Sequence, residues 1–332
     1  MLPKGAVLAL CHLMCSWQYL ETCDFFVDKR HFLEKRMLPE CVTQLATLLG
    51  LVCSVFLLSA TKASAGVDYL SYSLNDMSIL IINDTENRFA AKLFPTLDTY
   101  PDAKNYLVDG SFAGIVRTFA IKNGKRTILV DGGWGTESGK RGRTREILAQ
   151  VGISANDITD ILLTHLDIDH VSGLVENNAP VFANATLRLC RKEYDAWIVQ
   201  GHVRNEASEK RAKAVVALYE KAGRLSLFNW GDEVLPGITA LDAAGHTPGH
   251  TAFTLTSKGA SLVLLGDLLH AADLQLMHPN VNSVYDHDPA RAAEARNRIL
   301  SRCAQEKLAV AGAHILPIGI PSKMPKGGFV LQ

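Results

Sequence analysis

Short apolar runs alternate with polar stretches along residues 66–332, and this pattern predicts a mixture of strands and helices. Runs of about four to eight residues rich in Ile, Val and Leu are typical of buried strands. Strands are predicted over residues 79–82, 115–121, 127–130, 158–163, 238–243, 251–256, 261–265 and 308–313. Helices are predicted over residues 144–151, 192–199, 207–222 and 289–306.

Two local signals mark where these elements end. Residues 122–125, Lys-Asn-Gly-Lys, predict a hairpin turn between two neighbouring strands. Asp288 and Pro289 predict a helix start, because Asp is a good cap and Pro is favoured at the first helical position. The order of the elements indicates an α/β fold, with two mixed sheets packed face to face and helices outside.

The segment before this pattern differs from it, because residues 46–60 carry no charge. It has about 15 apolar residues, fewer than the roughly 20 that cross a bilayer. Lys35 and Arg36 precede it and Ala63-Ser64-Ala65 follows, which together are typical of a secretory signal peptide. We therefore expect cleavage after Ala65, a periplasmic or secreted protein, and no stable membrane insertion afterwards. An uncleaved anchor or a buried helix is the alternative.

This interpretation divides the chain into an N-terminal extension with signal peptide, residues 1–65, and one domain, residues 66–332. Lys+Arg and Asp+Glu both number 34, so the basic excess expected of a nucleic-acid-binding protein is missing. Only Cys190 and Cys303 lie after residue 65, and neither belongs to a C-x-x-C pair, which argues against a cysteine zinc site. A disulfide between them or two buried thiols both remain open.

The segment that carries chemistry is 164–170, Thr-His-Leu-Asp-Ile-Asp-His, directly after an apolar strand. His165, Asp167, Asp169 and His170 all have side chains that bind metals, and a loop can turn all four toward one point. Imidazole and carboxylate together suit zinc and other first-row metals. A polar surface loop with accidental histidines is the alternative.

Three further segments place similar side chains after predicted strands. His246 lies in a glycine-proline turn, residues 245–250, Gly-His-Thr-Pro-Gly-His. Asp267 follows the apolar run 261–265, and His314 follows the run 308–313. Each signal is weak alone, but their shared position at strand ends predicts that they meet at one metal site.

The order H-x-[HD]-x-D-H, GHTPGH, GD and a late GxH resembles the metallo-β-lactamase superfamily over about residues 110–320. Residues 184–194, 266–270, 285–289 and 310–314 most resemble the branch that contains methyl parathion hydrolase and exported lactonase-like enzymes. The resemblance implies a four-layer αβ/βα sandwich and two divalent metal ions, zinc first. It also implies that a hydroxide bridges the metals and attacks the substrate.

The resemblance further implies a role for each candidate residue. The first metal would be held by His165, Asp167 and His246, and the second by Asp169, His170 and His314. Asp267 would bridge the two metals, and Asp169 and Asp267 could also pass on a proton. Asp131 would orient the loop that carries the first-metal ligands without binding a metal itself, with a plain turn-forming Asp as the alternative. His250 is expected to stay off the metals.

Asp167 departs from the family pattern, which has histidine at this position. Zinc binds a carboxylate at about the same ~2 Å distance as imidazole. Counted from the ligands and the hydroxide alone, the site becomes formally neutral, where a histidine would leave one positive charge. The sequence hypothesis is therefore a weaker Lewis acid, a site more open to manganese or iron, and an Asp167→His variant active at lower pH.

Export and branch resemblance favour a small ester-like substrate, namely a lactone, an aryl ester or an organophosphate triester. A metallo-β-lactamase acting on β-lactams is one alternative. A non-catalytic metal or ligand binder is another, motivated by Asp167. A ribonuclease-type member would need a basic surface that the charge balance does not provide. A homodimer is common in the branch and is a further expectation.

Overall fold

The computed structural model describes residues 68–136, 141–201, 203–315 and 318–332. The apolar segment 46–60 and the predicted cleavage after Ala65 lie outside these residues, so the boundary at residue 65 stays a prediction. All described residues belong to one compact unit. Within these ranges, no helix combines the length and apolar character needed to cross a membrane.

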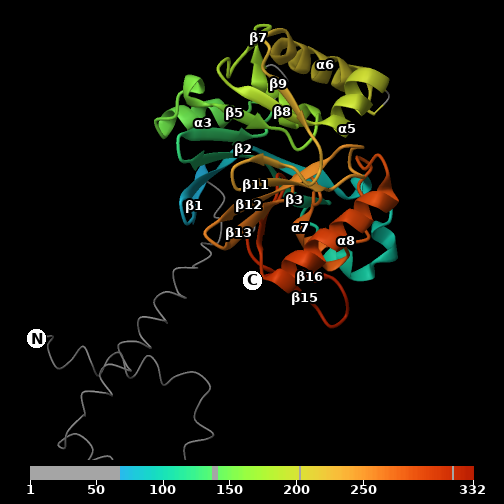
Figure 1. The fold of residues 1–332 in the computed structure, drawn as a ribbon. Coiled ribbons are helices and arrows are strands. Elements are labelled where there is room, and N and C mark those ends of the chain that lie inside the picture. Colours follow the sequence, from blue (N-terminus) through green and yellow to red (C-terminus); the bar gives the residue numbers. More distant parts are fainter. Residues whose placement is uncertain (1–67, 137–140, 202, 316–317) are drawn as a thin grey trace, which may run out of the picture. The chain divides into compact units, whose positions relative to one another are not determined.

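The larger sheet has seven strands in the order β1-β2-β3-β4-β5-β8-β9 (Figure 1). The strands are β1 Tyr69–Leu74, β2 Met77–Ala90, β3 Ser111–Asn123, β4 Arg126–Val130, β5 Asp160–Leu162, β8 Thr186–Cys190 and β9 Leu225–Phe228. Neighbours from β1 to β4 pair antiparallel, and β3 and β4 form the predicted hairpin. From β4 to β9 the pairing is parallel.

The smaller sheet has five strands in the order β10-β11-β12-β13-β14. They are β10 Glu233–Leu235, β11 Ile238–Asp242, β12 Thr251–Ser257, β13 Ala260–Leu264 and β14 Ala309–Ala311. Only the β13–β14 pair is parallel. Two small ribbons complete the strands: β6 Val175–Glu176 with β7 Ala179–Pro180, and β15 Pro321–Lys323 with β16 Phe329–Leu331.

The helices differ greatly in length. The α-helices are α3 Thr144–Gln150, α4 Ile168–Val171, α5 Arg191–Tyr194, α6 Glu206–Lys221, α7 Ala272–Met277 and α8 Pro289–Glu306. A π-helical stretch, η6 Asp195–Gln200, continues α5. Short 3₁₀ turns are η1 Ala91–Leu93, η2 Leu97–Thr99, η3 Pro101–Tyr106, η4 Ala155–Asp157 and η5 Ser172–Leu174.

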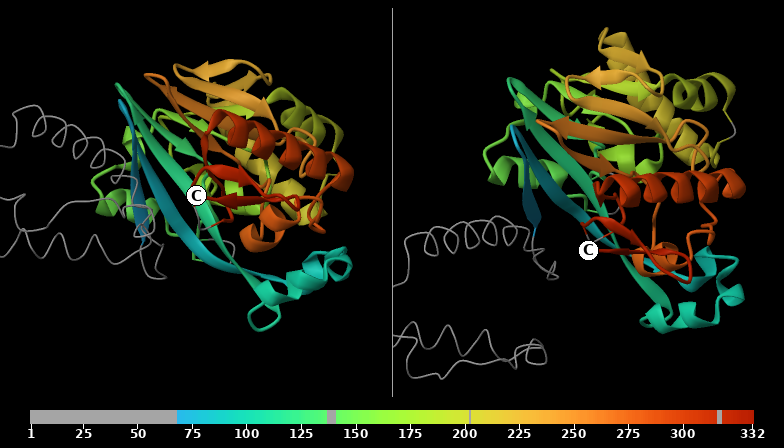
Figure 2. Two further views of the ribbon diagram at one scale, coloured as in Figure 1. Left: turned by 90° about the horizontal axis from the view of Figure 1, so that it is seen from below. Right: turned by 60° about the horizontal axis from the view of Figure 1, so that its bottom comes forward.

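Figure 2 shows the two sheets with helices on their outer sides. Three apolar clusters lie between the four layers. One face of the larger sheet packs on α3 and α6, through Leu148 and Val216 among others. Its other face packs on the smaller sheet, where Ile121 and Phe253 belong to one cluster. The far face of the smaller sheet packs on α7 and α8. Because strand side chains alternate between faces, single strands serve two clusters. The predicted four-layer sandwich is confirmed.

Elements with strong local signals were predicted well. The last helix spans residues 289–306 as predicted, and Asp288 caps it by accepting a hydrogen bond from the backbone N–H of Arg291. The sequence missed β1, β8, β9 and β10, which are three to six residues long. It also gave β2 only four residues instead of fourteen, because short apolar runs do not reveal how far sheet pairing extends.

Cys190 and Cys303 are both free and buried. Cys190 ends β8 and packs between the two sheets, whereas Cys303 lies on α8 in the outer cluster. The disulfide alternative is therefore wrong, and the buried-thiol alternative is correct.

Candidate metal centre

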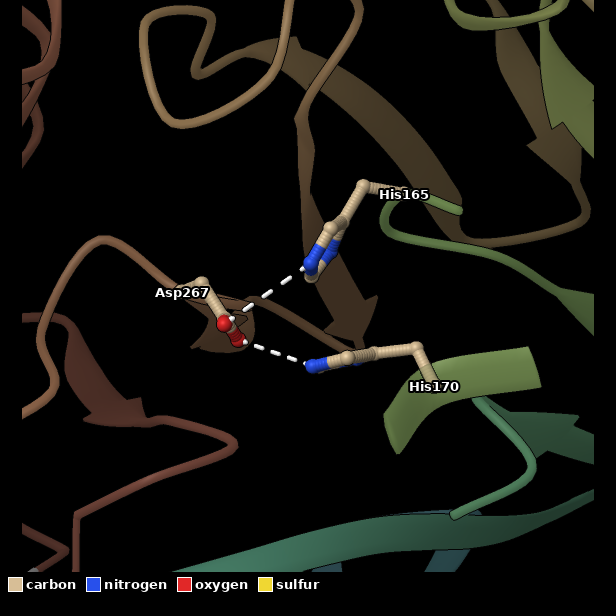
Figure 3. A group of neighbouring side chains, drawn as sticks. All are labelled: His165, His170 and Asp267. Carbon is tan, nitrogen blue, oxygen red and sulfur yellow. Dashed lines mark ion pairs between the residues drawn. The ribbon is translucent and has the colours of Figure 1, made fainter. Parts of the chain in front are cut away.

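The side chains predicted from the sequence gather around Asp267, at the carboxyl ends of strands from both sheets. His165 and Asp267 each lie a few residues past the ends of β5 and β13, and His246 and His314 likewise follow β11 and β14. Figure 3 shows the Asp267 carboxylate facing the rings of both His165 and His170. The three sets of possible ligands formed by the predicted residues are His165–Asp167–His246, Asp169–His170–His314 and His165–His170–Asp267.

The first set has the spacing of a tetrahedral site. Four ligands about 2 Å from one zinc ion are roughly 3.3 Å from one another. Asp167 Oδ2 lies 3.0 Å from His246 Nε2 and 3.4 Å from His165 Nε2. Asp267 Oδ2 lies 3.4 and 3.7 Å from the same two nitrogens. These residues fit a divalent cation.

The second set has similar spacing. His314 Nε2 lies 3.4 Å from Asp169 Oδ2 and 2.8 Å from Asp267 Oδ2. His170 Nε2 lies 3.2 Å from Asp267 Oδ1 and 3.8 Å from Asp169 Oδ2. The two oxygens of Asp267 thus reach both sets, as expected for a bridging carboxylate.

Each of the four imidazoles has its Nδ1 atom engaged away from the centre. His170 Nδ1 lies 2.9 Å from Asp131 Oδ2, and His246 Nδ1 lies 3.2 Å from Asp286 Oδ1. His165 Nδ1 contacts the Thr164 hydroxyl at 2.9 Å, and His314 Nδ1 the Ile115 carbonyl at 2.8 Å. An acceptor on Nδ1 fixes the ring and leaves Nε2 free to bind a metal.

The centre also contains buried polar atoms that form no hydrogen bond, although their side chains lie within ion-pair distance of one another. Among the described residues, Nε2 of His165, Nε2 of His170 and Oδ1 of Asp267 are buried without a hydrogen bond. Such atoms are rare in folded proteins, because desolvation without a partner costs about 1–3 kcal/mol each. All three point at the shared centre, so divalent cations would satisfy them together.

Glu193 joins two loops that carry predicted ligands, residues 164–170 and 245–250. It is fully buried and accepts hydrogen bonds from the backbone N–H of Leu166, the hydroxyl of Thr247 and the backbone N–H of Gly249. A Cβ atom at Gly249 would lie 2.1 Å from the backbone nitrogen of Glu193, so only glycine permits this approach. Burial outweighs these hydrogen bonds and raises the pKa of Glu193 to about 7.

Asp131 and His250 form hydrogen bonds with the segments that carry the predicted ligands. Asp131 accepts hydrogen bonds from the backbone N–H and hydroxyl of Thr164, beside its contact with His170. His250 contacts the Ala243 carbonyl and accepts a hydrogen bond from the backbone N–H of Asp267. Both therefore support the ligand loops from outside the ligand sets.

Sequence reasoning missed the partners of several ligands. Asp286 holds His246 and is itself 3.8 Å from the buried Arg296; His246 lowers the pKa of Asp286 to about 2, although burial acts in the opposite direction. His270 forms a fourth set with His246 and Asp267. Two sequence signals pointed to His270: its spacing of three residues from Asp267 and its place in the segment 266–270.

Arg204 corrects the charge count made from the ligands alone. Its Nε and Nη2 atoms donate to Oδ1 and Oδ2 of Asp167, both at 2.8 Å. This guanidinium returns the positive charge that replacing histidine with Asp167 removes. The charge count made from the ligands therefore leaves out Arg204, and the weaker Lewis acid stays a hypothesis.

Comparison with known proteins agrees with this geometry. Residues 111–314 match the model of the metallo-beta-lactamase superfamily. The chain belongs to this superfamily. The matched residues include all seven predicted ligands, and the predicted family is confirmed.

Curated relatives in the superfamily are lactonases. An N-acyl homoserine lactonase of Bacillus cereus is 33% identical over 124 residues, which cover 36% of this chain and 41% of that protein. One of Bacillus thuringiensis is 30% identical over 128 residues, covering 37% and 43%. The match thus spans about two fifths of the length of these relatives.

Solved superfamily structures align over most of the chain. The hydrolase AbOPH of the beta lactamase superfamily has a TM-score of 0.73 and 26% identity, covering 81% of this chain and 98% of that chain. AidC, a dizinc quorum-quenching lactonase, has a TM-score of 0.70 and 23% identity, covering 80% and 97%. These alignments support the fold described above.

Proposed function

We propose that this chain is a metal-dependent hydrolase of small, neutral, ester-like molecules, with lactones as the first substrate class. The observation that carries the proposal is a pair of ligand sets that both lie against the Asp267 carboxylate, with Nδ1 of each of their four histidines engaged by another group. Two divalent cations bound there, zinc first, would polarise a carbonyl or phosphoryl oxygen and acidify a water molecule.

The residues of the chain have distinct tasks in this reaction. Asp131 and Asp286 keep the rings of His170 and His246 in the orientation that binds a cation. Asp169 and Asp267 are the carboxylates within reach of the reacting atoms that can accept a proton. Because the metals and these carboxylates suffice, the reaction does not require a covalent intermediate.

The lactone class is supported by the relatives and by the surroundings of the centre. The Bacillus relatives are named as lactonases. Phe89 packs edge-on against His270 and His314, and Tyr285, 41% exposed, lies 5.8 Å from His270 between ring centroids. Of these two aromatic residues, Tyr285 is exposed, and an exposed aromatic ring beside the ligand sets favours an uncharged substrate with an apolar portion.

Aryl esters and organophosphate triesters remain within the proposal, because they too are hydrolysed by attack of water or hydroxide on a polarised carbonyl or phosphoryl group. β-Lactam hydrolysis and non-catalytic metal binding are the competing functions. Export to the periplasm or the medium and a homodimer are further parts of the proposal; they rest on the signal-like segment ending at Ala65 and on the branch resemblance.

A substrate panel tests the proposed function. The purified chain, loaded with zinc, is assayed on an N-acyl homoserine lactone, 4-nitrophenyl acetate, a phosphotriester and the β-lactam nitrocefin. We expect lactone hydrolysis that a chelator abolishes and zinc restores, with nitrocefin hydrolysed much more slowly. Nitrocefin as the best substrate would support a β-lactamase. Two bound metals without hydrolysis of any substrate would support a binding protein.

A further inference from the structure

Arg204 reaches the centre from a segment that supplies none of the predicted ligands. It lies between η6, which ends at Gln200, and α6, which begins at Glu206. The Glu209 carboxylate accepts a hydrogen bond from the backbone N–H of Val203, and Asn205 caps α6. The backbone on both sides of Arg204 is therefore anchored, and its side chain is only 16% exposed.

The contact between Arg204 and Asp167 uses both carboxylate oxygens. Nε and Nη2 of Arg204 donate to Oδ1 and Oδ2, each at 2.8 Å, and Nη2 also donates to the His246 carbonyl at 3.1 Å. Such two-point binding fixes the carboxylate plane as well as its position. Oδ2 still lies 3.0 Å from His246 Nε2, on the side of the first ligand set.

We propose that Arg204 is a positioning residue for the first cation, and that the Asp167–Arg204 pair takes the place of a neutral imidazole. This inference rests on the proposed two-cation site. Arg204 holds Oδ2 of Asp167 at the ligand position and cancels the charge of this carboxylate. A carboxylate oxygen can accept from Arg204 and bind a cation at the same time, because it has two lone pairs. The pair as a whole is neutral, like histidine.

This arrangement makes a prediction about pairs of substitutions. Asp167→His leaves the guanidinium unpaired a few ångströms from the first cation, where two like charges repel even at high effective dielectric. The single variant should therefore bind the first cation more weakly than the starting protein. Removing the guanidinium as well, in Asp167→His with Arg204→Met, should restore binding.

The experiment titrates the full-length, metal-free protein with Co²⁺ and Zn²⁺ against a chromophoric chelator. We expect two sites in the starting protein, a first-site affinity on the order of tenfold or more lower in Asp167→His, and recovery to within about threefold in the double variant. The Co²⁺ absorption spectrum reports first-site coordination independently of activity. Arg188→Met, which removes a partner of the distant Asp160, is the matched control and should leave both affinities unchanged.

Two results would overturn the inference. In one, Asp167→His binds both cations as tightly as the starting protein. In the other, the double variant is no better than the single variant. If Asp167→His does not fold, Asp167→Asn with and without Arg204→Met provides the same comparison. A starting protein that binds fewer than two cations would refute the proposed two-cation site. If the starting protein binds two cations but the double variant does not regain first-site affinity, only the proposed role of Arg204 is refuted.

Discussion

Asp131 Oδ2 lies 2.9 Å from Nδ1 of His170, and the same carboxylate holds the backbone of Thr164 at the start of the ligand loop. Asp131 adopts a left-handed backbone conformation, with φ of 59°, directly after β4. This turn brings its carboxylate under the end of the parallel neighbour β5. One buried side chain thus fixes both the ring and the loop that carries it.

Asp131→Asn is therefore expected to weaken metal binding. An amide in place of the carboxylate loses one acceptor, so it cannot satisfy the ring of His170 and both donors of Thr164. Loss of such a supporting group typically lowers metal affinity about 10–100-fold. Competition titration with a zinc chelator measures the change. An affinity within twofold of the starting protein would remove Asp131 from the supporting role.

Glu193→Gln is expected to destabilise the protein, although the side chain touches no predicted ligand. The amide NH₂ would face a backbone or hydroxyl donor in a fully buried position, where a lost hydrogen bond costs about 1–3 kcal/mol. Urea unfolding measures the free energy difference. The control is Glu176→Gln, because Glu176 forms an exposed pair with Arg145 and should contribute little. Equal effects of the two changes on the free energy of unfolding would contradict the role of Glu193 in joining the two loops.

How far the sequence predicted this site depends on how local each signal is. His165, Asp167, Asp169 and His170 follow one strand, so a single turn explains their grouping. Arg204 could not be found in this way, since it lies 37 residues beyond Asp167, in the segment between η6 and α6. The sequence carries no pattern that links an arginine in a connecting segment to one particular carboxylate.

The fold likewise divides into elements with local sequence signals and elements that depend on long-range pairing. The capped helix α8 and the hairpin β3–β4 were predicted from local signals. The positions of β8 and β9 depend on parallel pairing with β5. Their short runs, Thr-Leu-Arg-Leu-Cys and Leu-Ser-Leu-Phe, carry no local signal that distinguishes them from loop sequence. The segment containing Asp286 was singled out by resemblance alone, without its contact to His246.

Asp160 gives a prediction about pH that does not involve the metal centre. Burial opposes ionisation, but hydrogen bonds from Arg188, Thr159 and Arg126 outweigh it and lower the pKa of Asp160. A carboxyl group with a lowered folded-state pKa stabilises the fold above its unfolded pKa of about 3.9. That contribution is lost as the pH falls through the folded-state value.

Asp160→Asn should therefore lower the melting temperature at pH 7, and the difference should shrink below about pH 4. Both proteins are measured in chelator, so that metal release does not contribute. A difference that stays constant from pH 7 to pH 3 would show that the charge of Asp160 is not the source of the stability.

Removing metal from the intact protein should lower its stability. Asp167, Asp169 and Asp267 lie within one cluster of ligand sets, and cations binding there stabilise the folded state by mass action. At a free concentration about 1,000 times the dissociation constant, this amounts to about 4 kcal/mol. A chelator should reduce the melting temperature and added zinc should restore it. His287→Ala, a change at an exposed histidine, should keep the full shift; no shift in either protein would contradict a bound cation.

The most direct test of the account is the metal content of the full-length protein by elemental analysis after dialysis against metal-free buffer. The account predicts two divalent ions per chain, zinc foremost. It also predicts a reduction to about one in His314→Ala, because His314 belongs to the second set alone. A chain that retains no metal, or a His314→Ala variant that retains as much as the starting protein, would contradict it.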